Sequence, residues 1–132
     1  MLYSYWNEQT FHELKNCLLY RFYNLEGKRY MTIRIVTDST CDLPREIVEE
    51  NGIKVVPLYI HINGKNYLDE IDLTRHEYYE RLPSIHPPAT TAIPGTDVFK
   101  KVYDSLAEEG ATEILSIHIS HKLSGMVNVA EA

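Results

Sequence analysis

The twelve residues from Ile33 to Pro44 constrain the fold more than any other part of the sequence. Residues 33–36 are rich in β-branched apolar side chains and have the length of a buried strand. Residues 37–40 then place four hydroxyl or carboxylate groups where that strand would end. Asp42 can cap a following helix whose first turn accommodates Pro44. The pattern predicts a strand, a polar turn and a helix, and in α/β sheets ligands lie at the carboxyl ends of strands.

Strand signals continue after this unit. Residues 53–62 alternate apolar and mixed side chains, which predicts one half-buried strand, and Pro57 within it favours an edge or a bulge. Asn63-Gly64 predicts a tight hairpin turn because both residues tolerate positive φ. Residues 65–68 would form the short return strand.

A helix follows an acidic loop. Thr74 and Glu77 have the spacing of a capping box. The helix they begin is predicted to turn Tyr78, Tyr79 and Leu82 inward and to end before Pro83. Residues 84–94 contain three prolines, which predicts an extended, irregular loop. Such a loop inside a compact domain is often functional, and this one carries two consecutive threonine hydroxyls.

The last third of the chain predicts helix, strand and helix. Thr96 would cap a helix with a regular apolar stripe, and Gly110 would end it. Residues 113–119 form a nearly continuous apolar run, typical of a strand covered on both faces. A final helix is expected to begin near Met126.

Residues 1–30 differ from the rest, because they hold eight of the 14 aromatic residues. We interpret them as an extension to a domain that begins at Met31. A capping-box spacing at Thr10 and a stop at Gly27 predict one amphipathic helix. Its apolar stripe would be Phe11, Leu14, Leu18, Phe22 and Leu25. The extension could dock on the domain or mediate association, and the sequence does not choose between these roles.

Composition limits the classes of function. The net charge of −6 disfavours broad nucleic-acid binding, which needs a basic face. Cys17 and Cys41 have no metal-like spacing, so free thiols in a reducing, cytoplasmic setting are expected. No apolar run reaches the roughly 18 residues of a membrane span.

The alternation of elements predicts an α/β fold with a mainly parallel sheet flanked by helices. Parallel strands at 33–37 and 113–119 would bring residues 37–39 beside residues 120–125, with Thr90 and Thr91 completing a rim of small hydroxyl residues. Free N–H groups after Ser124 would favour an anion there. Hydroxyl donors beside abundant apolar side chains suit a carboxylate with an apolar tail.

Other chemistries find less support. The Ser/Thr cluster lacks a base and an orienting group for a nucleophilic triad, and no glycine-rich phosphate loop is present. Asp38 lacks the D-x-D spacing of acylphosphate enzymes. His118 and His121 lack a third metal ligand, and the acids at 69–72 lack ligand spacing. We therefore expect no metal, no cofactor and no catalytic residue.

Four segments together resemble the DegV family of bacterial lipid-binding proteins. They are Ile-Val-Thr-Asp-Ser-Thr-Cys-Asp-Leu-Pro (35–44), Val-Val-Pro-Leu (55–58), Thr-Thr-Ala-Ile-Pro-Gly (90–95) and Ile-Ser-His-Lys-Leu-Ser-Gly (119–125). The resemblance implies two α/β domains that hold one long-chain fatty acid between them, without catalysis by this chain. It also implies, for some members, presentation of the acyl chain to a fatty acid kinase.

The resemblance also implies site residues. The carboxylate ligands map onto Thr90, Thr91, Ser120, His121, Ser124 and Gly125, and Asp38 and Ser39 lie at the rim of the site. The sequence departs from the family where Ala92 and Ile93 replace a Ser-Gln pair, where His121 replaces a serine, and where Met126 replaces a hydroxyl residue. The family's second domain is missing, so we expect residues 31–132 to be incomplete at the C-terminus, as in a truncated product or fragment, and to bind fatty acid weakly.

Two other classes of function stay open. One is a small hydrolase or phosphotransferase-like enzyme that uses Asp38, Ser39 or His121. The other is an interaction module in which an exposed apolar face pairs two copies of the chain.

Overall fold

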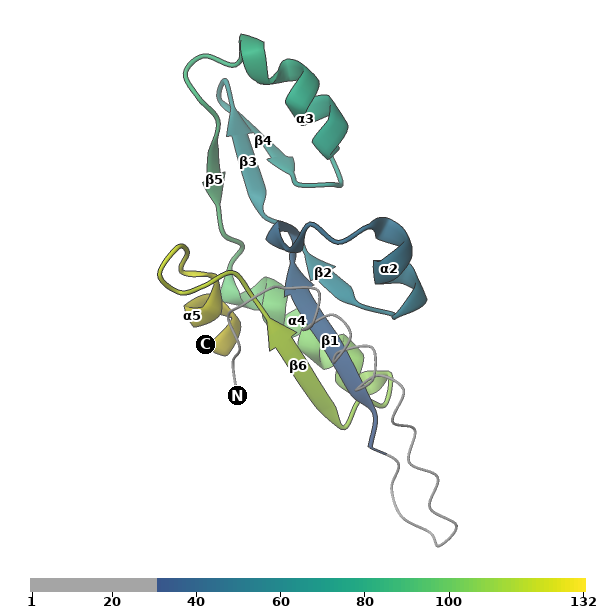
Figure 1. Ribbon diagram of the computed structural model, residues 1–132. Coiled ribbons are helices and arrows are strands. Elements are labelled where there is room, and N and C mark those ends of the chain that lie inside the picture. The colour runs from purple at the N-terminus through teal and green to yellow at the C-terminus, as the bar shows by residue number, and fades with distance from the viewer. Residues whose placement is uncertain (1–30) are drawn as a thin grey trace, which may run out of the picture.

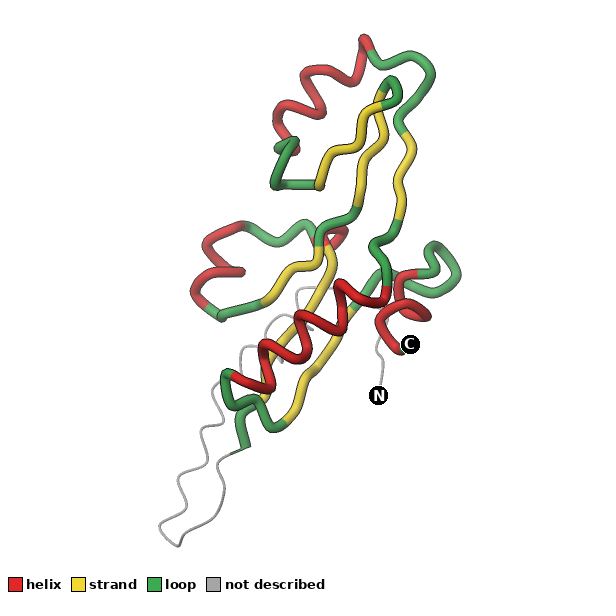
Figure 2. The backbone as a smooth tube through the Cα atoms, turned by 180° about the vertical axis from the view of Figure 1, so that it is seen from behind, coloured by secondary structure: helices red, strands yellow, loops and turns green. Residues whose placement is uncertain are grey.

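The computed structural model describes residues 31–132 as two three-stranded sheets arranged end to end (Figures 1 and 2). The strands are β1 (Ile33–Asp38), β2 (Lys54–Val56), β3 (Tyr59–Ile62), β4 (Lys65–Leu68), β5 (Thr90–Ala92) and β6 (Glu113–Ile117). The helices are α2 (Arg45–Glu50), α3 (Arg75–Arg81), α4 (Thr96–Glu108) and α5 (Met126–Glu131), with short 3-10 turns η1 (Ser39–Cys41) and η2 (Leu82–Ser84). The α/β class with a parallel sheet and flanking helices is confirmed. The helix and cap predicted within residues 1–30 lie outside the described residues.

The first sheet has the order β2-β1-β6 and is parallel throughout. The predicted pairing of the first and last strands is confirmed, with Val36 opposite Ser116 and Thr37 opposite Ile117. Alternate residues of a strand face opposite sides, so Val36 points toward α4 and joins a core with Phe99 and Leu106. Figure 2 shows α4 running along this face of β1 and β6.

The second sheet has the order β4-β3-β5 and is antiparallel. Its hairpin turn is as predicted, since Asn63 and Gly64 both have positive φ, at 49° and 77°. A smaller core of Ile60, Ile62, Leu73 and Ile85 lies between the sheet and α3.

Two expectations for this region are wrong. Residues 53–62 do not form one strand, because the chain leaves the parallel sheet after Val56 and enters the antiparallel sheet at Tyr59. Pro57, which has no N–H for a ladder, lies at the break. Residues 84–94 are not loop throughout, because Thr90–Ala92 pair with β3 as its edge strand.

The helix starts also differ from expectation. Asp42 does not cap α2, because it takes a left-handed conformation (φ 52°) at the end of η1, and Pro44 occupies the N-cap position without a side-chain hydrogen bond. Thr96 does not cap α4, because it is the first helical residue and Gly95 precedes it as the N-cap. The capping box of Thr74 and Glu77 is confirmed at α3.

Burial corrects three further expectations. Tyr79 and Leu82 do not point inward, since they are 63% and 42% exposed, whereas Tyr78 packs against the smaller core. Tyr79 is turned by about 100° from Tyr78 around α3, and Leu82 lies beyond the helix, in η2. Strand β6 is half-buried rather than covered on both faces, because within residues 31–132 it is an edge strand.

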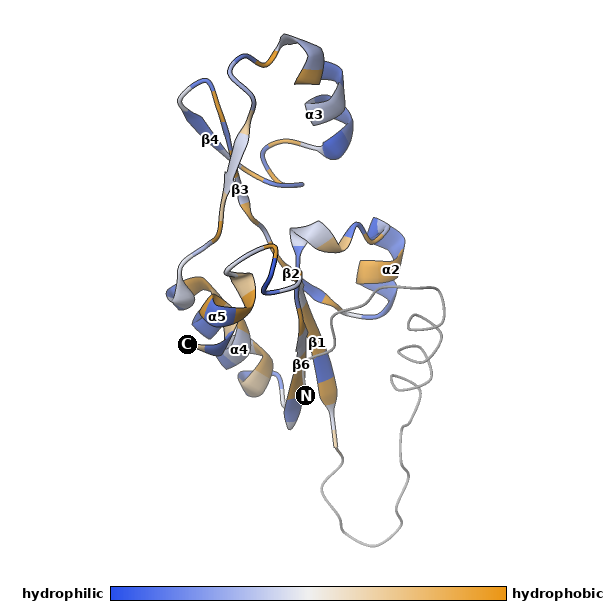
Figure 3. Cartoon of the chain, turned by 60° about the vertical axis from the view of Figure 1, so that its left-hand side comes forward, coloured by the Kyte–Doolittle hydropathy of each residue, from blue (hydrophilic) through white to orange (hydrophobic). Residues whose placement is uncertain are grey.

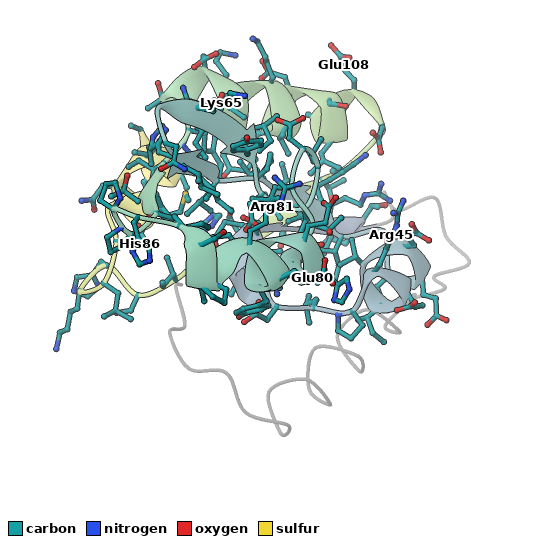
Figure 4. All side chains as sticks on the ribbon, turned by 90° about the horizontal axis from the view of Figure 1, so that it is seen from above. Arg45, Lys65, Glu80, Arg81, His86 and Glu108 are labelled. Atoms are coloured by element: carbon teal, nitrogen blue, oxygen red, sulfur yellow. The ribbon has the colours of Figure 1, made fainter. Side chains whose placement is uncertain are left out.

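Among residues 31–132, Asp38 is the one Asp, Glu, Lys or Arg that is buried, and the others are exposed or half-buried. In the view from above, Arg45 on α2 and Glu108 on α4 extend outward from the ribbon (Figure 4). Across residues 31–132, no helix combines the length and apolar character needed to cross a membrane.

Candidate functional site

A chain of hydrogen bonds joins the carboxyl ends of β1 and β6. Asp38 Oδ2 and His118 Nδ1 lie 2.8 Å apart, and both side chains are 1% exposed. His118 Nε2 is 2.7 Å from Ser116 Oγ, which is 2.8 Å from the Tyr103 hydroxyl on α4. The imidazole also meets the ring of Phe99 edge to face, with centroids 5.2 Å apart. The network fixes both strand ends against α4.

The second oxygen of Asp38 forms the turn that follows β1. Oδ1 accepts the backbone N–H of Thr40 over 3.0 Å and also accepts the Thr40 hydroxyl. Burial alone would raise the pKa of the Asp38 carboxyl, but hydrogen bonds from His118 and Thr40 outweigh it and hold the pKa below its usual value. Asp38 is therefore a structural carboxylate at the end of the central strand.

Ser39 connects the two halves of the molecule. Its hydroxyl accepts the N–H of Leu58 over 3.1 Å, at the point where the chain passes between the sheets. Its carbonyl accepts Nη2 of Arg75 over 2.9 Å, and the same guanidinium pairs with Asp42 and, at 3.1 Å, with Glu70. Arg75 thus ties α3 to the turn after β1.

Thr37 is buried like Asp38 and Ser39, but it differs from them in its hydrogen bonding. It is 2% exposed, and in the described part of the chain its hydroxyl has no hydrogen-bond partner. Because side chains alternate along β1, Thr37 points away from α4 and from the Asp38 network.

Residues 119–125 leave β6 beside the end of β1. The N–H of Ile119 donates to Asp38 Oδ2 over 3.4 Å, so the buried carboxylate anchors the start of this loop. The Ser120 carbonyl accepts the N–H groups of Leu123 and Ser124 at 2.8 and 3.1 Å. The hydroxyl of Ser120 accepts from Lys122 N, and that of Ser124 accepts from Met126 N, each over 3.3 Å. Both hydroxyls act as acceptors in these contacts and retain their own protons for donation.

The two Ser/Thr motifs meet between Gly125 and Ile93. A Cβ placed on Gly125 would lie 3.5 Å from Cδ1 of Ile93. Figure 1 shows the loop before α5 lying near the lower end of β5. Thr90 lies three residues earlier on extended backbone, about 10 Å up the strand from Ile93.

The two threonines of β5 face opposite sides of the antiparallel sheet. Thr91 pairs with Ile60, whose side chain enters the core beneath α3, and Thr90 pairs with His61 on the other face. Although the two threonines are adjacent in sequence, their hydroxyls therefore lie on opposite faces of the sheet. A ligand group at one face can reach only one of them.

The predicted site residues differ in accessibility. Asp38 and Ser39 are buried, at 1% and 3% exposed, so they support the surface from beneath. Ser120 and Ser124 are half-buried. The others, Thr90, Thr91, His121 and Gly125, are exposed.

Two acidic side chains of the loop at residues 69–72 accept hydrogen bonds from nearby backbone N–H groups. Asp72 accepts the N–H of Leu68 over 2.8 Å, and Glu70 accepts the N–H of Arg75 over 2.9 Å. Within residues 31–132 no group of three or more His, Cys, Asp or Glu side chains could hold a metal ion.

Sequence reasoning missed the network through His118, Ser116 and Tyr103. The signal was present, since parallel pairing of the two strands places Val36 beside Ser116, and Asp38 and His118 each lie two residues further along on the same face. The register was the information that the sequence did not supply.

Comparison with known proteins identifies related chains. The family model described as uncharacterised protein, DegV family, matches residues 32–132. A DegV domain-containing protein of Staphylococcus aureus strain N315 is 41% identical over 96 residues, covering 73% of this chain and 34% of that protein. A 15.5 kDa DegV domain-containing protein of Staphylococcus aureus is 40% identical over 96 residues, covering 73% of this chain and 67% of that protein.

Solved structures show the same architecture. A DegV family protein from Thermus thermophilus, described by its fatty acid binding, is 41% identical with a TM-score of 0.68, over 76% of this chain and 36% of that one. DegV of Bacillus subtilis, a fatty acid binding protein, is 31% identical with a TM-score of 0.70, over 76% and 36% of the two chains. The chain spans about a third of the length of these structures and of the strain N315 relative.

Proposed function

Because this chain belongs to the DegV family, we propose that it binds the carboxylate of a long-chain fatty acid at the rim where its two Ser/Thr motifs meet. The carboxylate-binding rim is defined as Thr90, Thr91, Ser120, His121, Ser124 and Gly125. The observation that carries the proposal is the close approach of the two motifs, since Cδ1 of Ile93 lies 3.5 Å from the position that a Cβ on Gly125 would take. Related structures described as fatty acid binding proteins share this part of the fold.

The chemistry of the rim suits an acidic head group. An ionised carboxylate only accepts hydrogen bonds, and threonine and serine hydroxyls each carry one proton to donate. Leaving a carboxylate in an apolar setting without donors would cost several kcal/mol or more, so the hydroxyls decide whether the head group is tolerated. Asp38, although acidic, is covered and hydrogen-bonded, so its charge does not face the rim directly.

Apolar surface adjoins the hydroxyls. Leu123 is 77% exposed beside Ser124, and Ile93 is 37% exposed beside the end of β5. Each methylene of an acyl chain that leaves water contributes about 0.8 kcal/mol. We propose that these two side chains receive the first methylenes of the tail, and that residues 1–132 alone bind weakly because they enclose only part of it.

A carboxylate held at exposed residues would stay accessible to a second protein. The proposal therefore includes presentation of the acyl carboxylate to a fatty acid kinase, the partner that the family resemblance implies. The geometry gives less support to an enzyme that uses Asp38 or Ser39, because both side chains are covered and engaged in hydrogen bonds.

Calorimetric titration with palmitate tests the proposal on four single variants. Thr90→Val and Ser124→Ala should each weaken binding at least tenfold, because each removes a donor to the carboxylate. Thr91→Val, on the opposite face of β5, should leave the affinity nearly unchanged, because a head group that meets Thr90 cannot also meet Thr91. Ser105→Ala, on the exposed side of α4, is the matched control and should leave the affinity unchanged. Wild-type affinity in all of the rim variants would contradict the proposal.

A further inference from the structure

The two sheets belong to halves of the molecule that have separate apolar cores. We call residues 59–92 the antiparallel half and the rest of residues 31–132 the parallel half. Every residue of the larger core lies in the parallel half, and every residue of the smaller core lies in the antiparallel half. The backbone passes between the halves at residues 57–58 and at residues 93–95, and Figure 3 shows these two connections. The angle between the halves therefore depends on two short connections and on polar contacts.

Arg75 is the residue of the antiparallel half whose side chain makes hydrogen bonds or ion pairs with the parallel half, within residues 31–132. Its Nη2 donates to the Ser39 carbonyl over 2.9 Å, and its Nη1 pairs with the carboxylate of Asp42. Its Nε lies 3.1 Å from Glu70, which also accepts the backbone N–H of Arg75 over 2.9 Å. Glu70 lies in the same half as Arg75, so it orients the guanidinium while the other two nitrogens reach across the junction.

The Arg75 contacts and the carboxylate-binding rim lie on opposite sides of the junction. Figure 1 shows α3 and β5 on opposite sides of β3, with α2 on the α3 side and the loop before α5 on the β5 side. The connection at residues 57–58 lies between them, and Ser39 Oγ holds the N–H of Leu58 there over 3.1 Å. A rotation about this connection that changes the gap beside Arg75 therefore also changes the separation of Thr90 from Ser124.

We propose that Arg75 is a positioning residue for the carboxylate-binding rim. Its contacts with the parallel half hold the two halves at one angle, and this angle sets the separation between Thr90 and the loop that carries Ser124. The proposal rests on the proposed function, because it assigns Arg75 a role in that same site. A head group that takes donors from both motifs requires one separation between them. Fixing this separation before the ligand arrives lowers the ordering cost of binding.

A distance measurement across the Arg75 side tests the proposal without a ligand. Spin labels are attached to Glu50→Cys on α2 and Glu80→Cys on α3, two exposed positions, in a full chain whose native cysteines are replaced by serine. Electron–electron double resonance then gives the distribution of distances between the labels. Arg75→Met should broaden this distribution at least twofold. Arg45→Met is the matched control and should leave it unchanged, because the ion pair of Arg45 lies within α2.

A double-mutant cycle separates positioning from a general loss of stability. Asp42→Asn should broaden the distribution by a smaller factor than Arg75→Met, because the Ser39 carbonyl keeps its contact with the guanidinium. In the Arg75→Met background, Asp42→Asn should add almost nothing, since the shared contact is already absent. Arg75→Lys should give an intermediate width, because lysine keeps the charge but not the planar fork. Additive effects of the changes at Arg75 and Asp42 would overturn the proposal.

Palmitate titration of the unlabelled variants connects the angle to the rim. Arg75→Met should weaken binding about fivefold, and Arg45→Met should not change it. An unchanged distance distribution in Arg75→Met would overturn the proposal whatever its affinity. A broader distribution with wild-type affinity would also overturn it, because the angle would then not position the rim. Absence of palmitate binding by the wild-type chain would instead overturn the proposed function, and with it the role of Arg75 in the rim, whereas the distances would still show whether Arg75 holds the halves together.

Discussion

The two sheets of this protein differ in the burial of their polar side chains. In the parallel sheet the side chains of Asp38 and His118 are each 1% exposed and hydrogen-bond to each other. In the antiparallel sheet the hydroxyl residues Thr90 and Thr91 are exposed on an edge strand. A central strand is enclosed by its neighbours and by a helix, whereas an edge strand leaves its side chains and one row of backbone groups open. We therefore expect the parallel half to be the more stable one, whereas the antiparallel half leaves hydroxyl groups open to solvent.

The two halves meet at a few polar contacts. Arg75 of α3 reaches the Ser39 carbonyl and Asp42, and Ser39 in turn holds the N–H of Leu58 between the sheets. Each half has its own apolar core, so their relative stability can be measured by equivalent substitutions.

The largest expected difference concerns those two cores. Leu106 and Leu73 are both 0% exposed, but Leu106 lies in the larger cluster with Val36, Phe99 and Met126. We expect Leu106→Ala to lower the free energy of unfolding by about 4 kcal/mol and Leu73→Ala by about 3 kcal/mol, because the smaller core can relax around the cavity. Urea denaturation measures both. A larger loss for Leu73→Ala would reverse the assignment of the stable half.

The buried network should contribute the next largest effect. Asp38→Ala removes the partner of His118 and of the Thr40 N–H, and should cost about 3 kcal/mol of unfolding free energy. Asp38→Asn, which keeps the shape and one carbonyl acceptor, should cost less. An equal and small cost for both variants would show that the network is not a source of stability.

The same carboxylate predicts a pH dependence. Its pKa is lower in the folded chain than the ordinary value of 3.8, so its contribution is fully present above that value and is lost as the pH falls through the folded pKa. The wild-type chain should therefore lose stability below about pH 4 more steeply than Asp38→Asn. Parallel pH profiles of thermal unfolding for the two proteins would contradict this assignment.

The smallest expected effect lies on the surface of the antiparallel half. Thr74→Ala removes the cap of α3 and should cost about 1 kcal/mol. Hydrogen bonds from the Thr74 backbone and hydroxyl hold the pKa of Glu77 below its usual value, and that pKa should rise in the variant. Thr96→Ala is the matched control, since Thr96 follows the N-cap of α4 rather than occupying it. A loss of stability in Thr96→Ala as large as in Thr74→Ala would contradict the cap assignments.

Local signals predicted local structure well. The capping box at Thr74, the Asn63-Gly64 turn and the end of α4 just before Gly110 each depend on a few neighbouring residues, and all three are present. The parallel pairing of β1 with β6 also followed from two apolar runs of strand length.

Features that depend on distant contacts could not be predicted. Residues Thr90–Ala92 form a strand because they pair with the edge of β3, whereas the prolines that flank them, at 87, 88 and 94, indicated an irregular loop. The local sequence favours Asp42 as a helix cap. In the structure Asp42 instead ends η1 and pairs with Arg75, which lies far along the chain. Register, and with it the pairing of Asp38 with His118, needed the assembled sheet.

Recognition of an acidic head group at the carboxylate-binding rim is most directly tested by comparing palmitate with its methyl ester. The two ligands share an acyl chain, and the ester lacks the charge that hydroxyl donors favour. Titration of the full chain by calorimetry should show palmitate binding at least tenfold more tightly than the ester. Equal affinities, or no binding of palmitate at all, would contradict the account.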